Sequence, residues 1–175
     1  MHKGKAVLGL LAVAATALSI AVSARAVELA ALGAPTEAPI LTISGNIGAT
    51  NAGATAQFDR AMLEQMGMES FTTTTPWFTG PVEFEGVPLA DLMTAVGANG
   101  TEIEAVALND YKATIPIEDF EKYHVLLALK RDGEYMPVRD KGPLFIVYPY
   151  DEHGELQAQK FYSRSVWQVK ELVVR

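Results

Sequence analysis

The chain has 175 residues, no cysteine, and a formal net charge of −7 from 14 Lys and Arg against 21 Asp and Glu. This acidic balance argues against a protein that binds nucleic acid or anionic lipid head groups, because clusters of Lys and Arg are needed to hold phosphates. About 150 residues follow the N-terminal segment described next, enough for one domain that buries a core without disulfides.

The N-terminus has the pattern of a secretory signal peptide. Lys3 and Lys5 precede an apolar stretch over residues 6–22, and Ala24-Arg25-Ala26 forms an A-x-A cleavage site. A membrane anchor is the alternative, because 17 apolar residues approach the length that spans a bilayer. The small residues at the exit favour cleavage, so we expect an exported chain with no direct membrane insertion. The expected organisation is a signal peptide over 1–26, a lead-in over 27–39 and one domain over 40–175.

Short elements alternate along the rest of the chain. The hydrophobic pattern predicts strands over 40–47, 69–75, 82–84, 102–108, 111–115, 125–130, 144–148 and 167–174. It predicts three helices, over 57–66 with Asp59 as N-cap, over 87–95 and over 116–123. The last strand requires a bulge to keep Val169, Leu172 and Val174 on one face. Three short helices cannot cover both faces of a parallel sheet, so we expect an α+β domain.

Four segments, in order, resemble segments of the sulfite-oxidase-type molybdopterin oxidoreductases. They read FTTTTPWFTGPVEFEGVPLADL over 71–92, ALNDYKATIPIEDF over 107–120, LLALKRDGEYMPVRDKGPLFIVYPY over 126–150 and YSRSVWQVKELVV over 162–174. Each segment is weakly specific alone, but together they cover nearly the whole mature chain. The resemblance implies a single sulfite-oxidase-like molybdopterin-binding domain, built as a mixed β-sheet or barrel.

The same resemblance places the metal-ligating cysteine of those enzymes at about Thr74. A threonine hydroxyl has a pKa far above that of a thiol and lacks the soft sulfur that suits a heavy metal. The histidines have no zinc-ligand spacing. The acidic run over 151–155 could hold a divalent cation, although an exposed turn is the simpler interpretation. We therefore expect no molybdenum, no metal site and no catalytic residue.

A smaller branch of the same fold is more similar: exported, cysteine-free proteins that bind a reduced pterin. The resemblance implies a non-enzymatic periplasmic protein whose partners are a small-molecule pterin and the periplasmic domain of an inner-membrane cyclic-di-GMP enzyme. One alternative is a molybdopterin-dependent oxidoreductase-like subunit without a cysteine ligand. Another is an interaction domain that has lost its ligand.

A pterin site needs aromatic faces and a few fixed donors and acceptors, because the ligand is a flat heterocycle with polar edges. The candidate pterin-binding residues lie in the resembling segments. They are Thr74, Thr75, Trp77, Asn109, Asp110, Tyr111, Tyr148, Tyr162, Ser163, Arg164, Ser165 and Trp167.

Several of these candidates have a structural alternative. Trp77 and Trp167 could pack in the core instead of facing a ligand. Asn109-Asp110 is a pair suited to a tight turn. Arg164 could form an ion pair with an acidic neighbour instead of donating to a ring carbonyl.

Overall fold

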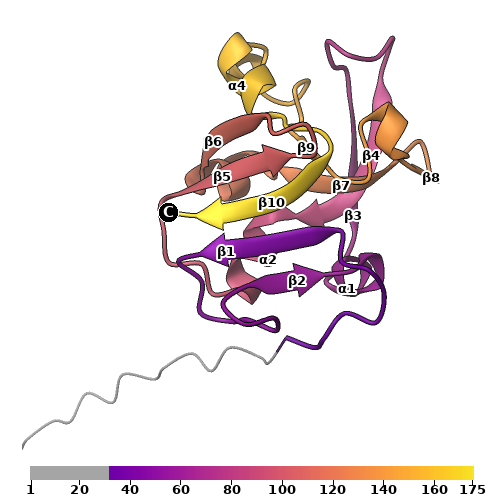
Figure 1. Cartoon of the computed structure of the whole chain (residues 1–175). Coiled ribbons are helices and arrows are strands. Elements are labelled where there is room, and N and C mark those ends of the chain that lie inside the picture. The colour runs from indigo at the N-terminus through magenta and orange to yellow at the C-terminus, as the bar shows by residue number, and fades with distance from the viewer. Residues whose placement is uncertain (1–31) are drawn as a thin grey trace, which may run out of the picture.

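The structure is a computed structural model that describes residues 32–175, so the predicted signal peptide and the start of the lead-in lie outside the described residues. The strands of this part (Figure 1) are β1 (Leu41–Gly45), β2 (Ala56–Phe58), β3 (Glu69–Thr73), β4 (Val82–Pro88), β5 (Glu102–Ala107), β6 (Lys112–Pro116), β7 (Leu126–Arg131), β8 (Glu134–Tyr135), β9 (Phe145–Val147) and β10 (Val169–Val174). The helices are α1 (Arg60–Gln65), α2 (Leu89–Ala95), α3 (Glu118–Tyr123) and α4 (Gln159–Arg164), with 3-10 turns η1 (Val138–Asp140) and η2 (Gly154–Leu156). Within this range no helix has the length and apolar character needed to cross a bilayer.

The strands form two sheets. The first has the order β2-β1-β10-β5-β6, and the second has the order β3-β4-β7-β8 with β9 also paired to β7. Strand β1 runs parallel to the C-terminal strand β10, with Ile43 opposite Leu172, and the other pairs are antiparallel. The predicted α+β class is confirmed. The barrel alternative is wrong, because within residues 32–175 the edge strands of the first sheet pair with no strand of the second.

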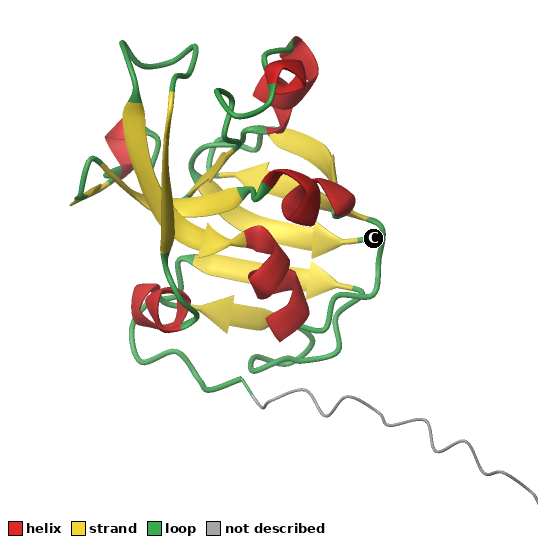
Figure 2. Ribbon diagram, turned by 180° about the vertical axis from the view of Figure 1, so that it is seen from behind, coloured by secondary structure: helices red, strands yellow, loops and turns green. Residues whose placement is uncertain are grey.

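The core lies between the sheets and the helices packed on them. In Figure 2, which views the molecule from behind Figure 1, α2 and α3 lie in front of the first sheet and cover one of its faces. Ile43 and Leu172 of that sheet, Leu92 of α2, Phe120 of α3 and Leu127 of β7 are all buried in one apolar cluster. Full burial of each such side chain contributes about 1.5–3 kcal/mol. Truncation of Leu172, which is fully buried in the cluster, is therefore expected to cost about 2–5 kcal/mol.

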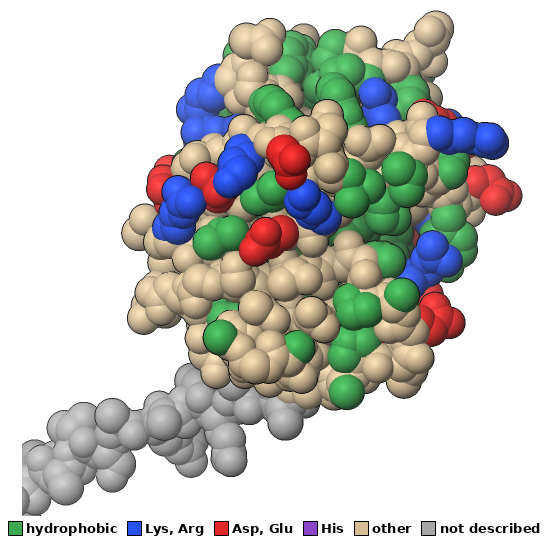
Figure 3. Space-filling view, in the orientation of Figure 1, with side chains coloured by type: hydrophobic (Ala, Val, Ile, Leu, Met, Phe, Trp, Pro, Cys, Tyr) green, Lys and Arg blue, Asp and Glu red, His purple; other side chains and the backbone are tan. Residues whose placement is uncertain are grey.

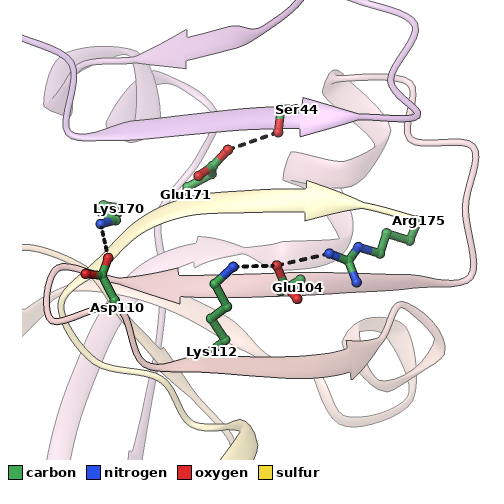
Figure 4. Close-up of polar contacts among 7 residues, drawn as sticks. All are labelled: Ser44, Glu104, Asp110, Lys112, Lys170, Glu171 and Arg175. Carbon is green, nitrogen blue, oxygen red and sulfur yellow. Dashed lines mark hydrogen bonds and ion pairs between the residues drawn. The ribbon is translucent and has the colours of Figure 1, made fainter.

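The opposite face of the first sheet carries paired charges. Glu104 contacts both Lys112 and Arg175, Lys170 contacts Asp110, and Ser44 donates to Glu171 (Figure 4). The space-filling view shows the two signs interspersed over this face (Figure 3). Exposed pairs of this kind contribute little to stability. Their positions fit a sheet with one solvated face, in which polar side chains point outward and apolar side chains point into the core.

The predicted last strand is confirmed together with its bulge, although it begins at Val169 instead of residue 167. The register between β10 and β5 shifts between Val169 and Glu171, and the shift lets Val169, Leu172 and Val174 all point into the core. Gly86 occupies a second irregular position, between β4 and β7. A Cβ on Gly86 would lie 2.2 Å from the Leu127 carbonyl oxygen, so this close approach of the strands requires glycine.

Some predicted boundaries are wrong at the ends of elements. Residues 56–58 form β2 instead of the start of a helix, and α1 begins at Arg60 because the Asp59 carboxylate caps it by accepting from the Met62 N–H. Strand β3 ends at Thr73 instead of residue 75, where the chain turns towards Pro76. Strand β4 continues to Pro88, so the following helix begins at Leu89.

Candidate functional site

A cavity of about 340 Å³ lies where the β3–β4 loop, the β5–β6 turn and α4 meet. Its volume is at the lower end of the range for sites that bind small molecules. The lining residues come from three distant parts of the sequence. They are Pro76, Trp77, Ala107, Asn109, Tyr111, Gln159, Tyr162, Ser163, Ser165 and Trp167.

The apolar wall of the cavity is an aromatic cluster centred on Trp77. Its ring centroid lies 5.5 Å from that of Phe145, 5.6 Å from Trp167, 6.0 Å from Tyr162 and 6.2 Å from Tyr150, each with an edge-to-face geometry. Such contacts are favourable for aromatic rings. Trp77 therefore packs in the interior and also lines the cavity, and Trp167 does the same.

The polar groups of the cavity belong to the β5–β6 turn and to α4. Asn109 Oδ1 accepts from the Tyr111 N–H at 3.1 Å, an arrangement that fixes the amide and leaves its NH₂ group free to donate. The Tyr111 hydroxyl donates to the Ser163 carbonyl oxygen at 2.9 Å and so ties the turn to α4. Gln159 Nε2 donates to Ser163 Oγ at 3.3 Å. Together they place amide and hydroxyl groups beside the aromatic wall.

The innermost polar side chain of the cavity lining is buried and satisfied. Ser165 Oγ donates to the Phe161 carbonyl and shares a hydrogen bond with the Tyr150 hydroxyl. Burial raises the pKa of Tyr150 above its ordinary value, so its phenol stays neutral. No Lys, Arg, Asp or Glu is among the lining residues within the described part of the chain. The cavity suits an uncharged, flat ligand with hydrogen-bonding edges.

Seven of the twelve predicted site residues line this cavity: Trp77, Asn109, Tyr111, Tyr162, Ser163, Ser165 and Trp167. Sequence reasoning missed Pro76, Ala107 and Gln159. Gln159 could have been found, because it lies three and four residues before Tyr162 and Ser163 and therefore on the same face of a helix. The helix itself was not predicted.

Thr74 and Thr75 lie beside the cavity without lining it. The Thr74 hydroxyl donates to Asp151 Oδ1 at 2.5 Å, and the Thr74 N–H donates to Asp151 Oδ2 at 2.6 Å. Thr75 Oγ1 accepts from the Trp77 N–H at 3.3 Å. Both hydroxyls therefore organise the loop that carries Trp77.

Asp110, Tyr148 and Arg164 point away from the cavity. Asp110 pairs with Lys170 on the outer face of the sheet at 2.8 Å. Tyr148 is fully buried and donates to Asp119 Oδ2 at 2.9 Å. Arg164 Nη1 contacts the same carboxylate oxygen at 2.6 Å, which is the ion-pair alternative weighed from the sequence. These three predicted side chains therefore do not line this cavity.

Two other kinds of site have less support than this cavity. Among residues 32–175 no group of three or more His, Cys, Asp or Glu side chains is arranged to hold a metal ion. A second hollow lies between the start of β1 and η1. None of its lining residues is aromatic, so it offers no face on which a flat ring could stack.

The family comparison fits this geometry. Residues 51–152 match the model of the family described as the oxidoreductase molybdopterin binding domain, and no curated protein matches the chain. The matched range carries five lining residues, from Pro76 to Tyr111, whereas α4 and Trp167 of the opposite wall lie beyond it. It covers more than half of the 175 residues. The chain therefore belongs to the oxidoreductase molybdopterin binding domain family, with its sulfite-oxidase-like fold.

Proposed function

We propose that this protein is a non-enzymatic pterin-binding protein. The observation that carries the proposal is the cavity itself: an aromatic wall of Trp77, Tyr162 and Trp167 faces amide and hydroxyl groups. Among residues 32–175, no charged side chain lines it. A pterin ring has two large faces and a polar edge that donates and accepts. Stacking on aromatic rings binds the faces, and fixed amides recognise the edge.

Asn109 is the best-placed group for the ring edge. Its oxygen is held by the Tyr111 N–H, so its NH₂ group is oriented without a ligand and can donate to a ring carbonyl or nitrogen. Gln159 and Ser163, already hydrogen-bonded to each other, supply further donors and acceptors on α4. Because these groups are held by hydrogen bonds within the protein, binding requires little additional ordering of side chains.

The family name implies a molybdopterin cofactor, and the residues present fit its ring better than its metal. The chain has no cysteine to supply a thiolate. Thr74, at about the position of the family's metal-ligating cysteine, donates its hydroxyl to Asp151. In the part of the chain that the structure describes, the cavity lining also lacks Lys and Arg, the side chains that bind a cofactor phosphate. We therefore assign the cavity to the pterin ring and not to molybdenum.

We further propose that the protein acts in the periplasm and relays pterin binding to the periplasmic domain of an inner-membrane cyclic-di-GMP enzyme. The support for export is the sequence pattern of residues 1–26. The support for the relay is the resemblance to cysteine-free pterin-binding proteins of this fold. A protein that reports a ligand needs no catalytic group.

The test is to identify what the native protein carries. The chain is purified from the periplasm of its own organism, denatured, and the released small molecules are identified by mass spectrometry and fluorescence, with metal analysis of the same sample. We expect a pterin near one equivalent and no molybdenum. Stoichiometric molybdenum, or a preparation free of any heterocycle under reducing conditions, would contradict the assignment.

The relay is tested separately in cells. Deletion of the gene should change the cellular level of cyclic-di-GMP, and the wild-type gene should restore it. A Trp77→Ala variant should fail to restore it, whereas Phe78→Ala, which alters an aromatic side chain of the same loop outside the cavity lining, should succeed. Equal complementation by both variants would contradict the proposed relay of pterin binding to the cyclic-di-GMP enzyme.

A further inference from the structure

We propose that Asp151 is a positioning residue that holds Trp77 in the wall of the cavity, and that Thr74 is its partner. Asp151, Thr74 and the neighbouring Thr73 form what we call the clasp, which joins the start of the β3–β4 loop to the turn after β9. This inference rests on the proposed function for its effect on ligand binding. Its effect on Trp77 can be measured without any ligand.

The clasp consists of three hydrogen bonds between Asp151 and the end of β3. Its carboxylate accepts from the Thr74 hydroxyl at 2.5 Å and from the Thr74 N–H at 2.6 Å. In the reverse direction, the Asp151 N–H donates to Thr73 Oγ1 at 3.1 Å. Hydrogen bonds to a carboxylate are stronger than neutral ones, and two on one residue fix its orientation.

Thr73 provides the rigid end of the clasp. Its side chain is fully buried, and it is the last residue of β3, paired with Val82 across the hairpin. Thr74, by contrast, is exposed and stands at the point where the chain leaves the sheet. The contacts with Asp151 therefore determine the direction in which the loop departs.

Trp77 follows Thr74 by three residues, and the chain between them has little freedom. Thr75 precedes Pro76, a position that disfavours helical backbone angles, and Thr75 Oγ1 accepts from the Trp77 N–H. A fixed direction at Thr74 is thus transmitted to the Trp77 ring. That ring contacts Phe145 at the start of β9 and Tyr150 directly before Asp151, and also Tyr162 and Trp167.

The clasp requires a strong hydrogen-bond donor in the side chain at position 74, and a threonine hydroxyl provides it. A cysteine there would be a weak donor and could not form the same short bond to a carboxylate. Serine would keep the hydroxyl, and valine would keep the shape without it. This series separates loss of the hydrogen bond from loss of packing.

The first experiment measures Trp77 directly. The chain contains two tryptophans, so a Trp167→Phe background leaves Trp77 as the single tryptophan, which is excited at a wavelength where the tyrosines do not absorb. Acrylamide quenching is compared for Asp151→Asn, Thr74→Val and Thr74→Ser in that background. The matched controls are Glu152→Gln, which makes the same charge change one residue away, and Thr72→Val, on the exposed side of β3.

We expect Asp151→Asn and Thr74→Val to make Trp77 more accessible to acrylamide, and Thr74→Ser to restore the wild-type value. The controls should leave quenching unchanged, and urea unfolding should confirm that every variant is folded. Quenching that stays at the wild-type level in both Asp151→Asn and Thr74→Val would overturn the positioning role. So would equal changes in the control variants, because they would indicate a general loosening of the fold.

The second experiment measures ligand release with the full chain and tetrahydropterin as the probe. Because the clasp acts on the wall and not on the ligand, Asp151→Asn should raise the dissociation rate about fivefold, and Thr74→Ser should leave it near that of the wild type. More accessible Trp77 with an unchanged dissociation rate would contradict a role in binding. A wild-type chain that does not bind tetrahydropterin would contradict the proposed function, while quenching would still decide whether Asp151 positions Trp77.

Discussion

Arg164 Nη1 lies 2.6 Å from Asp119 Oδ2, and this ion pair attaches α4 to α3. The same carboxylate oxygen accepts from the Tyr148 hydroxyl at 2.9 Å. Both side chains of the pair are largely buried, with 17% and 7% of their surface exposed. Since α4 presents Gln159, Tyr162 and Ser163 to the cavity, the pair on its other side holds one wall of the site in place.

Asp119→Ala is expected to destabilise the fold by about 2 kcal/mol, because it leaves the guanidinium of Arg164 and the hydroxyl of Tyr148 without a buried partner. The measurement is urea unfolding at neutral pH. Lys170→Ala is the matched control, since it breaks an ion pair on the exposed face of the sheet and should cost less than about 1 kcal/mol. Equal losses in the two variants would show that the buried position of Asp119 is unimportant.

Trp77→Ala should weaken pterin binding by roughly 1 kcal/mol or more, equivalent to at least about a fivefold rise in Kd, through loss of stacking and of the wall around the ligand. Isothermal titration with a reduced pterin gives the affinity, and circular dichroism gives the fold. Phe78→Ala in the same loop should bind like the wild type, because Phe78 is not among the cavity-lining residues. A folded Trp77→Ala variant with wild-type affinity would remove Trp77 from the site.

Much of the fold could be predicted because its elements carry local signals. Asp59 before an apolar helical pattern was sufficient to place an N-cap, and the spacing of Val169, Leu172 and Val174 was sufficient to predict a bulge. Helix α4 was missed. It has only six residues, and only Phe161 among them is buried, so it shows no hydrophobic period. Its position depends on the distant contact with Asp119, which no local pattern contains.

The candidate site could be predicted only in part from local sequence patterns. Trp77, Asn109 and Trp167 belong to segments with a family pattern, and the fold brings them together. Arg164 was predicted as a ligand contact because its charge and donors suit a ring carbonyl. The structure turns it to the far side of α4, where Asp119 provides an opposite charge. Sequence can indicate which side chains suit a ligand, but the direction in which each one points depends on tertiary contacts.

Asp59 should make the protein sensitive to acid. The N–H groups of Met62 and Glu37, together with Thr36, hydrogen-bond its carboxylate and hold its pKa below the ordinary value of 3.8. A lowered folded pKa stabilises the native state above the unfolded value, and that stabilisation is lost as the pH falls below about 3.8 through the folded pKa.

Urea midpoints measured from neutral pH down into this range should therefore fall for the wild type and fall less for Asp59→Asn. Asp59→Ala, which also removes the cap of α1, should lower the melting temperature by about 3 °C at neutral pH. Asp91→Asn on the exposed face of α2 is the control. An identical acid dependence in wild type and Asp59→Asn would show that other carboxylates dominate.

At high pH the stability should instead depend on Tyr148 and Tyr150. Burial raises the pKa of both phenols above the ordinary value of 10.0, and the nearby Asp119 carboxylate adds to the effect at Tyr148. Because the folded pKa is raised, the contribution of each neutral phenol to the free energy of unfolding is complete below the unfolded pKa. It is lost as the pH rises above the unfolded pKa, since the unfolded chain then releases protons that the native state retains. Above about pH 10 each tyrosine should reduce the free energy of unfolding by about 1.4 kcal/mol per pH unit.

Urea unfolding from pH 8 to 11 checks this slope. Replacement of either residue by phenylalanine removes its titration, so Tyr148→Phe and Tyr150→Phe should each flatten the alkaline decline even where they lower stability at neutral pH. Tyr111→Phe, at the exposed rim of the cavity, serves as the control. Absorbance at 295 nm should show the two buried phenols ionising only together with unfolding. Ionisation of all tyrosines in the folded protein near pH 10 would contradict the prediction and would mean that water reaches the interior beneath the cavity.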